Sequence, residues 1–295
     1  LMAAMQPATP AVAEAPAWPR DRVLTQSVRV IIENGRVGCS LSLRGGRIDD
    51  IALRKYFETL EKKDPVILLS PPDTNLPRFV ELGWIAESGV KVPDEKTLWQ
   101  ISGGDRLTPQ TPVTLFWENG QGLRFERTLS LDEYFMITAK DTVTNNGTAA
   151  VTLHPYGLIS QKGQPDIISH SWLLLEGPIG YIGDQLIENT YGTMQKKPQQ
   201  SWTVAQGWAA LNEKYWLTSV IPQQGEQLSF RMTYTGVPPK KGDKDLGRYQ
   251  IDFTGAEKTI APGQSASTEN KIFVGAKQVL LLEDYAKKLG IPHFD

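Results

Sequence analysis

Chemically reactive residues are scarce in this chain, which has 295 residues but only 1 cysteine and 3 histidines. The single cysteine, Cys39, can form neither an intramolecular disulfide nor a cysteine-based metal cluster. His154 and His170 are too far apart for a short zinc-binding motif, and no cysteine is available to complete one. We therefore predict that the chain binds no metal ion.

Local motifs of enzymes that use nucleophiles or nucleotides are also missing. The sequence contains no Gly-x-Ser-x-Gly elbow, no glycine-rich phosphate loop between a strand and a helix, and no His-Glu-x-x-His pair. Adjacent carboxylates such as Asp49–Asp50 and Glu283–Asp284 are common in a chain with 33 acidic residues, and we interpret them as solvated turns and helix faces. We predict no catalytic residue and no cofactor.

Charge of one sign is not concentrated in this sequence. Its 31 basic and 33 acidic residues nearly cancel, which argues against a field strong enough to hold nucleic acid. The strongest basic clusters, Lys196–Lys197 and Lys240–Lys241, lie beside proline or glycine, and we interpret them as solvated loops without a partner. We expect no nucleic-acid partner.

Long apolar runs are absent as well. No stretch approaches the roughly 20 residues that cross a bilayer, and residues 1–20 lack the basic and apolar regions of a signal peptide. We expect any export signal to lie outside this sequence. Residues 1–21 are rich in alanine and proline, which favours an extended linker over a packed core.

From residue 22 onward the chain is a succession of short apolar segments separated by turn residues. The turn pairs Asn34–Gly35 and Gly45–Gly46 predict two hairpins, with strands at 28–32, 37–43 and 48–53. The same rhythm continues to residue 277 with segments rich in β-branched and aromatic residues. We predict a mainly β domain over 22–277, in which antiparallel sheets stack face to face.

The segment after the last strand has a helical period instead. Residues 278–289 place Val279, Leu282, Tyr285 and Leu289 on one apolar stripe, and Gly290 supplies a left-handed C-terminal cap. We predict an amphipathic helix within a C-terminal segment 278–295. It either covers part of a sheet or contacts something outside this chain.

The aromatic segment Gly207–Pro222 has two possible roles. Asn212–Lys214 reads as a turn between two mostly apolar strands, so we favour a core hairpin that buries Trp208 and Trp216. The alternative is that these aromatic side chains line the wall of a cleft.

The sequence LHPYGL at 153–158 is the one local pattern that suggests chemistry. Large two-sheet β proteins of the galactose mutarotase type use a histidine on a strand as general acid, and sugar sites add aromatic platforms. We therefore name His154, Tyr156, Trp172 and Trp208 as candidate residues of a cleft or partner surface. A carbohydrate- or peptide-binding module and a sugar epimerase stay open as alternatives, although a lone histidine in a strand is usually an ordinary hydrogen-bonded polar residue.

Four landmarks in a fixed order support a comparison with a known family. They are SLRGGRIDDIALRKY, TVTNNGTAAVTL, GWAALNEKYWLTSVIP and KIFVGAKQ, and the last leads into the predicted helix. From about residue 22 to 290 the chain resembles the large periplasmic domain of bacterial YidC membrane protein insertases. The resemblance implies a β-supersandwich of galactose mutarotase-like architecture, placed between the first and second transmembrane helices at the periplasmic face of the inner membrane.

The resemblance also implies a function. The domain would be non-catalytic, would support the insertion and folding of inner-membrane proteins, and would contact the Sec translocon. Nascent inner-membrane proteins would be partners of the full-length protein, whose hydrophilic groove lies in membrane helices that this sequence does not contain. The C-terminal helix, with Val279, Leu282, Tyr285 and Leu289, would couple the domain to the membrane-embedded part.

Overall fold

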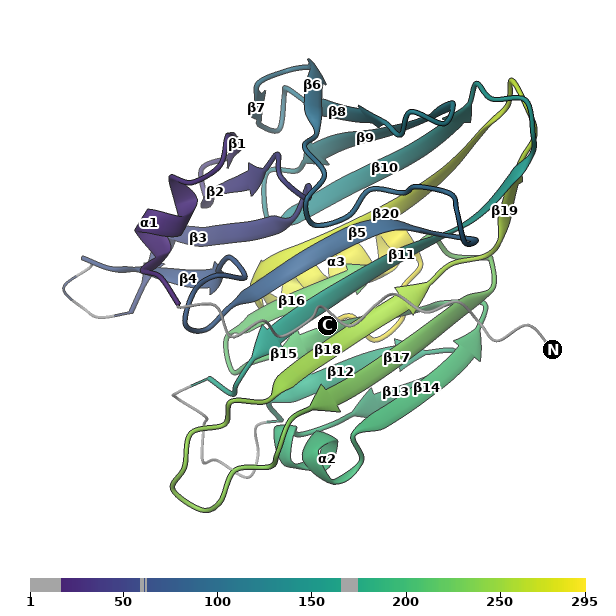
Figure 1. Cartoon of the computed structure of the whole chain (residues 1–295). Coiled ribbons are helices and arrows are strands. Elements are labelled where there is room, and N and C mark those ends of the chain that lie inside the picture. Colours follow the sequence, from purple (N-terminus) through teal and green to yellow (C-terminus); the bar gives the residue numbers. More distant parts are fainter. Residues whose placement is uncertain (1–16, 59–60, 62, 166–174) are drawn as a thin grey trace.

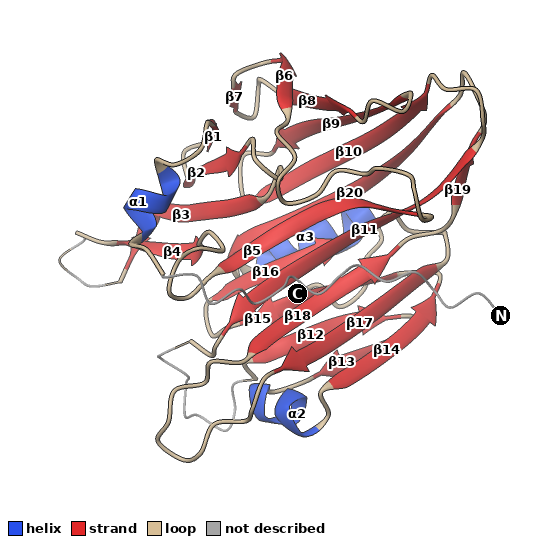
Figure 2. Ribbon diagram, in the orientation of Figure 1, coloured by secondary structure: helices blue, strands red, loops and turns tan. Residues whose placement is uncertain are grey.

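Two large β-sheets dominate the structure (Figure 1, Figure 2). The computed structural model describes residues 17–58, 61, 63–165 and 175–295. Among the described strands every pairing is antiparallel except that of β1 (Arg29–Glu33) with β7 (Arg106–Leu107), as hairpin-rich sequences favour. The helices in the described residues are α1 (Arg20–Leu24), α2 (Tyr191–Lys196) and α3 (Val279–Leu289).

The first sheet has 11 strands within the described residues. Strands that are distant in sequence lie side by side at its centre, where β11 (Val151–Lys162) pairs with both β5 (Arg78–Ala86) and β18 (Arg248–Thr254). Its main order is β14 (Gln199–Val204), β17 (Leu228–Thr235), β18 (Arg248–Thr254), β11 (Val151–Lys162), β5 (Arg78–Ala86), β3 (Ile48–Phe57), β2 (Val37–Ser42), β1 (Arg29–Glu33) and β7 (Arg106–Leu107). Two further strands lie off this path: β19 (Lys258–Ile260) pairs with β11, and β4 (Pro65–Leu69) pairs with β3.

The second sheet has 9 strands in the same part of the chain. Its centre also joins distant segments, because β20 (Ser265–Ala276) pairs with both β10 (Met136–Asn145) and β16 (Trp216–Ile221). Its order is β13 (Gln185–Glu188), β12 (Gly177–Ile182), β15 (Gly207–Asn212), β16 (Trp216–Ile221), β20 (Ser265–Ala276), β10 (Met136–Asn145), β9 (Leu123–Leu131), β8 (Val113–Glu118) and β6 (Gln100–Gly103). The predicted mainly β architecture of stacked antiparallel sheets with a C-terminal helix is confirmed.

The N-terminal hairpins form where the turn residues predicted them. The backbones of β1 and β2 pair across the Asn34–Gly35 turn, where the Asn34 side chain accepts hydrogen bonds from the backbone N–H groups of Arg36 and Val37. Gly45 and Gly46 have φ angles of 76° and 63°, in the left-handed region that glycine enters without a steric penalty. Local turn chemistry therefore sets these boundaries.

The two sheets pack face to face around an apolar core, as the alternation of buried residues along β9 shows. A buried ion pair lies within this core. The Arg127 guanidinium donates to the Asp141 carboxylate at 2.7 and 2.8 Å, and both side chains are 3% exposed. Arg127 also donates to the backbone carbonyls of Gly46 and Leu82, so the pair connects the second sheet to the first.

The ordered domain begins before residue 22. Helix α1 starts at Arg20, and the backbone N–H of Trp18 donates to the carbonyl of Asp73 at 3.0 Å. The Arg22 guanidinium lies 3.5 Å from the centre of the Trp18 ring. Residues 17–21 therefore belong to the fold and not to a linker, while residues 1–16 lie outside the described part.

The C-terminal segment adds a third layer behind the second sheet (Figure 1). Leu281, Leu282 and Tyr285 of α3 are buried, and the Tyr285 ring makes an edge contact with Phe273 of β20. Gly290 ends the helix with a φ of 62°, as the sequence predicted. The helix covers a sheet face, which is the first of the two roles that the sequence left open.

Candidate functional site

His154 and Tyr156 lie on the outward face of the first sheet. Their neighbours Leu153 and Ile159 are fully buried in the core, and side chains alternate between the two faces of a strand. His154 and Tyr156 are both half-buried. The two candidate residues therefore share one surface, on the opposite side of the sheet from the core.

The Tyr156 hydroxyl belongs to a closed polar cluster. It donates to Glu81 at 2.6 Å, and the other oxygen of the same carboxylate accepts from Arg47 at 2.5 Å. Burial, followed by the negative charge of Glu81, raises the pKa of Tyr156 well above its usual value. Because the phenol stays protonated and both Glu81 oxygens are already bonded, neither group is available as a general base at neutral pH.

His154 has a different environment. Its Nδ1 lies 3.2 Å from the carbonyl oxygen of Gly255, and its Nε2 lies 3.9 Å from a carboxylate oxygen of Glu257. The Glu257 side chain is 58% exposed. This is the ordinary setting of a hydrogen-bonded strand histidine, and it contains no carboxylate held across an enclosed groove.

Trp208 lies on the other side of the molecule. It is 2% exposed, packs edge-on against Phe294, and donates its indole N–H to the Pro292 carbonyl at 2.9 Å. It therefore belongs to the layer formed by the C-terminal segment. Trp208 does not share a cleft with His154 and Tyr156, and Trp172 lies outside the described residues.

The hairpin predicted around Asn212–Lys214 is present, with β15 and β16 as its strands. Its two tryptophans differ in how deeply they are buried. Trp208 is fully buried, whereas Trp216 is only half-buried and contacts the rings of Tyr56 and Tyr215 at one open end of the sandwich. The core interpretation is thus right for Trp208 and only partly right for Trp216.

A polar connection holds α3 to both sheets. The Tyr285 hydroxyl donates to the Asp132 carboxylate, which also accepts from the backbone N–H groups of Tyr134 and Met136. The Asn34 side chain donates to the carbonyls of Asp132 and Tyr134 at 2.8 and 2.9 Å. Burial and the Asp132 charge raise the pKa of Tyr285, so the donor stays protonated. The helix is therefore fixed relative to the β1–β2 turn of the other sheet.

One residue of the predicted helix stripe is wrongly placed. Leu282 and Tyr285 are buried and Leu289 is half-buried, but Val279 is 64% exposed. Leu281 takes its place, which moves the centre of the buried stripe so that Val279 lies roughly 100° away around the axis. Val279 cannot hold the helix to the sandwich.

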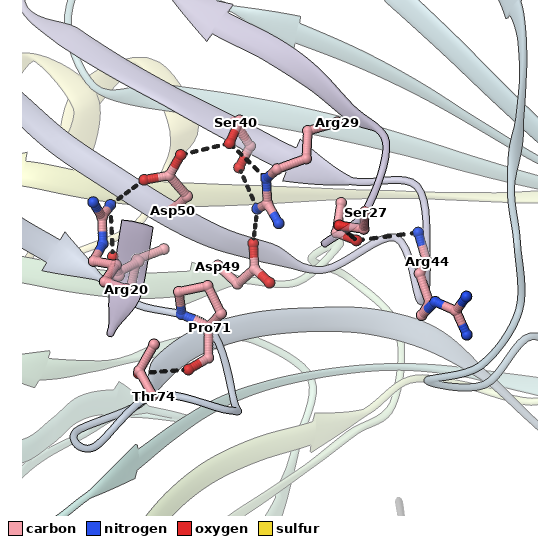
Figure 3. Close-up of polar contacts among 11 residues, drawn as sticks. Arg20, Ser27, Arg29, Ser40, Arg44, Asp49, Asp50, Pro71 and Thr74 are labelled. Atoms are coloured by element: carbon pink, nitrogen blue, oxygen red, sulfur yellow. Dashed lines mark hydrogen bonds and ion pairs between the residues drawn. The ribbon is translucent and has the colours of Figure 1, made fainter. Parts of the chain in front are cut away.

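The paired carboxylates Asp49 and Asp50 were also misjudged from the sequence. They lie within β3, are 4% and 8% exposed, and form ion pairs with Arg29 and Arg20 respectively (Figure 3). Ser40 bonds to Asp50 and to Arg29, so the two pairs form one network that holds α1 against the sheet. Adjacent acids in a strand are buried when arginines from neighbouring elements reach them, which no local pattern shows.

Other features of the described residues offer no reactive site. No group of three or more potential metal ligands occurs among them, and none of their helices is long and apolar enough to span a bilayer. A shallow depression of about 260 Å³ is lined by residues that include Gln223, Lys271 and Leu289. Burial raises the pKa of the Cys39 thiol above its usual value, which keeps it protonated.

Solved structures that resemble this chain share its fold. A galactose mutarotase-like protein from Lactobacillus casei matches with a TM-score of 0.52 and 11% identity, covering 84% of this chain and all 100% of its own. At this identity the likeness shows the architecture alone.

Sequence relatives are much closer. A membrane protein insertase YidC from Bradyrhizobium diazoefficiens is 39% identical, and one from Methylobacterium radiotolerans is 38% identical; each match covers 99% of this chain and 48% of the relative. The chain thus spans about half the length of these relatives. The family model described as the YidC periplasmic domain matches residues 29–294. The chain belongs to the family of YidC periplasmic domains.

Proposed function

We propose that this chain is a non-catalytic periplasmic domain of a membrane protein insertase. It supports the insertion and folding of inner-membrane proteins, and through the full-length protein it contacts nascent membrane proteins and the Sec translocon. Insertion itself occurs in the part of the protein that this chain does not include. The family match over residues 29–294 supports the assignment to an insertase.

The structural observation that carries the proposal is the attachment of α3. Tyr285 bonds to Asp132, Trp208 bonds to Pro292, and Phe294 packs against both Trp208 and Phe273. Contacts on both sides of Gly290 thus hold the C-terminal segment to the second sheet. A segment held in this way transmits the position of the sandwich to whatever it is joined to, which is the coupling that we assign to it.

A non-catalytic role agrees with the state of the polar residues. Glu81 is bonded by Tyr156 and Arg47, and His154 faces a backbone carbonyl and an exposed carboxylate. General acid–base catalysis needs a free acid and a free base that converge on one substrate position. The groups at β11 do not have this arrangement.

The test uses the full-length protein in cells depleted of their own insertase. We expect the double variant Leu282→Ala with Tyr285→Phe to lower membrane insertion, because it removes buried contacts and the bond to Asp132. Lys287→Gln is the matched control, since Lys287 is on the same helix and exposed. Insertion is measured as protease protection of a labelled membrane protein.

Folding must be measured in parallel, because the double variant removes core contacts. Circular dichroism on the isolated variant chain shows whether the sandwich persists. If deletion of residues 278–290 left insertion activity intact, coupling through α3 would be refuted, whatever the stability of the variant.

A further inference from the structure

One end of the sandwich exposes several large apolar side chains. Val237 and Leu280 are 86% and 81% exposed, and Leu246, Val279 and Tyr215 are 69%, 64% and 58% exposed. We call these five residues the apolar end surface. They come from the β17–β18 loop, the β15–β16 turn and the first turn of α3. Apolar side chains that gather on a surface commonly mark an interaction site.

Pairing and contacts place these three segments at the same end. The start of β18 lies beside the end of β11, since Arg248 pairs with Lys162, and the neighbouring Gln161 pairs with Arg78 at the start of β5. The Arg78 guanidinium in turn binds the Glu213 carboxylate of the β15–β16 turn at 2.7 and 3.0 Å. In Figure 1 the end of β17, the start of β18 and the start of β16 all lie on the left.

The first turn of α3 joins the same group. The backbone N–H of Lys277 donates to the Tyr215 carbonyl at 2.9 Å, and the Gln278 amide donates to the Tyr56 hydroxyl at 3.0 Å. Tyr56 packs edge-on against Trp216, with ring centres 5.2 Å apart. The half-buried rings of Tyr56 and Trp216 therefore lie beside the start of α3.

Positive charge accompanies this surface. None of its neighbouring lysines forms an ion pair within the described residues, and the Lys214 ammonium lies 5.0 Å from the centre of the Tyr215 ring. Three carboxylates at this end are engaged: Glu213 binds Arg78, Asp245 accepts from Tyr249, and Glu176 accepts from the backbone N–H of Lys214. Asp243 and Glu283 are the remaining carboxylates of these segments. The lysines are Lys214, Lys240, Lys241, Lys244 and Lys277.

Lys162 and Arg248, at the adjoining ends of β11 and β18, add positive charge at this end. The β3–β4 loop follows Tyr56 and carries both signs, and Glu61 and Lys63 bind each other at 2.8 Å. The positive excess at this end therefore comes from the lysines of the apolar segments together with Lys162 and Arg248.

Resting on the proposed function, we infer that the apolar end surface contacts the anionic lipid headgroups of a bilayer and inserts Val237, Leu246, Val279 and Leu280 among them. Tyrosine and tryptophan favour the level of the headgroups, where their rings are apolar and their polar atoms stay wet. Lysines gain about 1 kcal/mol each near an anionic lipid surface. The apolar side chains, aromatic rings and lysines at this end are the residue types that such a headgroup layer favours.

The shape of this surface favours lipid over a peptide ligand. The most exposed tips project from a loop and from the first turn of a helix, and the depression of about 260 Å³ is lined by other residues. A peptide site is normally a groove with fixed pockets, whereas a fluid headgroup layer adapts to projecting side chains.

The test is flotation of this chain with vesicles of phosphatidylglycerol and phosphatidylethanolamine, compared with vesicles of phosphatidylcholine alone. We expect binding to the anionic vesicles only, and binding that weakens as salt concentration rises. The double variant Val237→Ser with Leu280→Ser should partition roughly tenfold less. Lys240→Gln with Lys241→Gln should reduce partitioning by roughly fivefold per lysine.

Matched controls replace side chains away from this end. Leu98 and Leu186 are 58% and 51% exposed, and Leu186 pairs with Tyr181, which lies beside Trp208 at the other end of β15. Leu98→Ser with Leu186→Ser should float like the unchanged chain, as should Lys91→Gln with Lys140→Gln. All these positions are exposed, so thermal melting should remain the same in each variant.

Two outcomes would overturn the inference. In the first, the unchanged chain fails to float with anionic vesicles. In the second, the control variants lose binding as much as the end-surface variants do, which would indicate non-specific adsorption. Neither outcome bears on the insertase role, because flotation measures no insertion; conversely, loss of insertion in the α3 variants would leave the lipid contact unaffected.

Discussion

The indole N–H of Trp208 donates to the carbonyl oxygen of Pro292 at 2.9 Å, which joins β15 to the chain beyond α3. The same ring packs edge-on against Phe294, with centres 5.1 Å apart. One side chain therefore contributes both a buried apolar surface and a hydrogen bond to the third layer.

Trp208→Ala should lower the free energy of unfolding by about 3 to 5 kcal/mol, because it leaves a cavity between β15 and the C-terminal segment. Urea unfolding followed by circular dichroism measures this change. Trp216→Ala is the natural comparison, and since Trp216 is half-buried we expect a loss of roughly half as much. Equal losses for the two variants would contradict the difference in packing.

Trp208→Phe tests the hydrogen bond more directly. The phenyl ring keeps most of the apolar contact but leaves the Pro292 carbonyl without its donor. We expect the free energy of unfolding to fall by about 1 to 3 kcal/mol. Amide hydrogen exchange at Ile291 and Phe294 should become faster than in the unchanged chain, while exchange in α2 stays the same. Unchanged exchange in the C-terminal segment would show that the bond does not hold it.

The buried ion pair of Arg127 and Asp141 predicts that one substitution lowers the free energy of unfolding strongly. Asp141→Asn removes the charge that compensates the guanidinium in a site where both side chains are 3% exposed. We expect a loss of about 3 to 5 kcal/mol in the free energy of unfolding. Arg124→Gln is the control, because its partner Glu118 is 64% exposed and such pairs contribute under about 1 kcal/mol.

The buried phenol of Tyr191 predicts that the folded chain loses stability at alkaline pH. Burial raises the pKa of Tyr191 to about 12, above the value of about 10 in an unfolded chain. Folding therefore favours the protonated phenol, and this stabilisation is complete below about pH 10 and is lost as the pH rises toward 12.

The corresponding measurement compares urea midpoints at pH 8 and pH 11. We expect the unchanged chain to lose about 1 to 1.5 kcal/mol from this residue over the interval. Tyr191→Phe should lose that much less, although at pH 8 it costs roughly 1 kcal/mol for the hydrogen bond from Gln161. Identical alkaline slopes in both proteins would exclude Tyr191 as the source.

From the surroundings of His154 we predict that the chain does not accelerate the mutarotation of sugars. Polarimetry on freshly dissolved α-galactose or α-glucose should show the same rate of mutarotation with the chain, with His154→Ala and with buffer alone. Acceleration by the unchanged chain that disappears in His154→Ala would instead support an epimerase. The bonds between Glu81, Tyr156 and Arg47 are the reason for expecting none.

Local patterns in the sequence were sufficient for many elements. The Asn34–Gly35 and Gly45–Gly46 turns, the hairpin around Asn212–Lys214 and the end of α3 at Gly290 all occur where they were predicted. Each depends on residues within a few positions of one another, so backbone conformation and periodicity suffice to predict it.

Local sequence patterns could not predict which candidate residues lie together in the folded chain. His154 and Trp208 were grouped because sugar sites combine a strand histidine with an aromatic platform, yet they lie on opposite sides of the sandwich. Asp49 and Asp50 were interpreted as solvated, yet Arg29 and Arg20 reach them in the folded chain. These relationships depend on which strands lie side by side and which face each one turns inward.

The sequence by itself determined the strands, the turns, the C-terminal helix and the family, because these follow from short-range patterning and from a run of matching landmarks. Only the tertiary structure decided that Trp208 packs beneath the C-terminal segment, that Arg127 and Asp141 share the core, and that Val237 and Leu280 expose their side chains at the same end. The physical reason is that β5 pairs with β11 and β10 pairs with β20, so the decisive contacts join residues that are far apart along the chain.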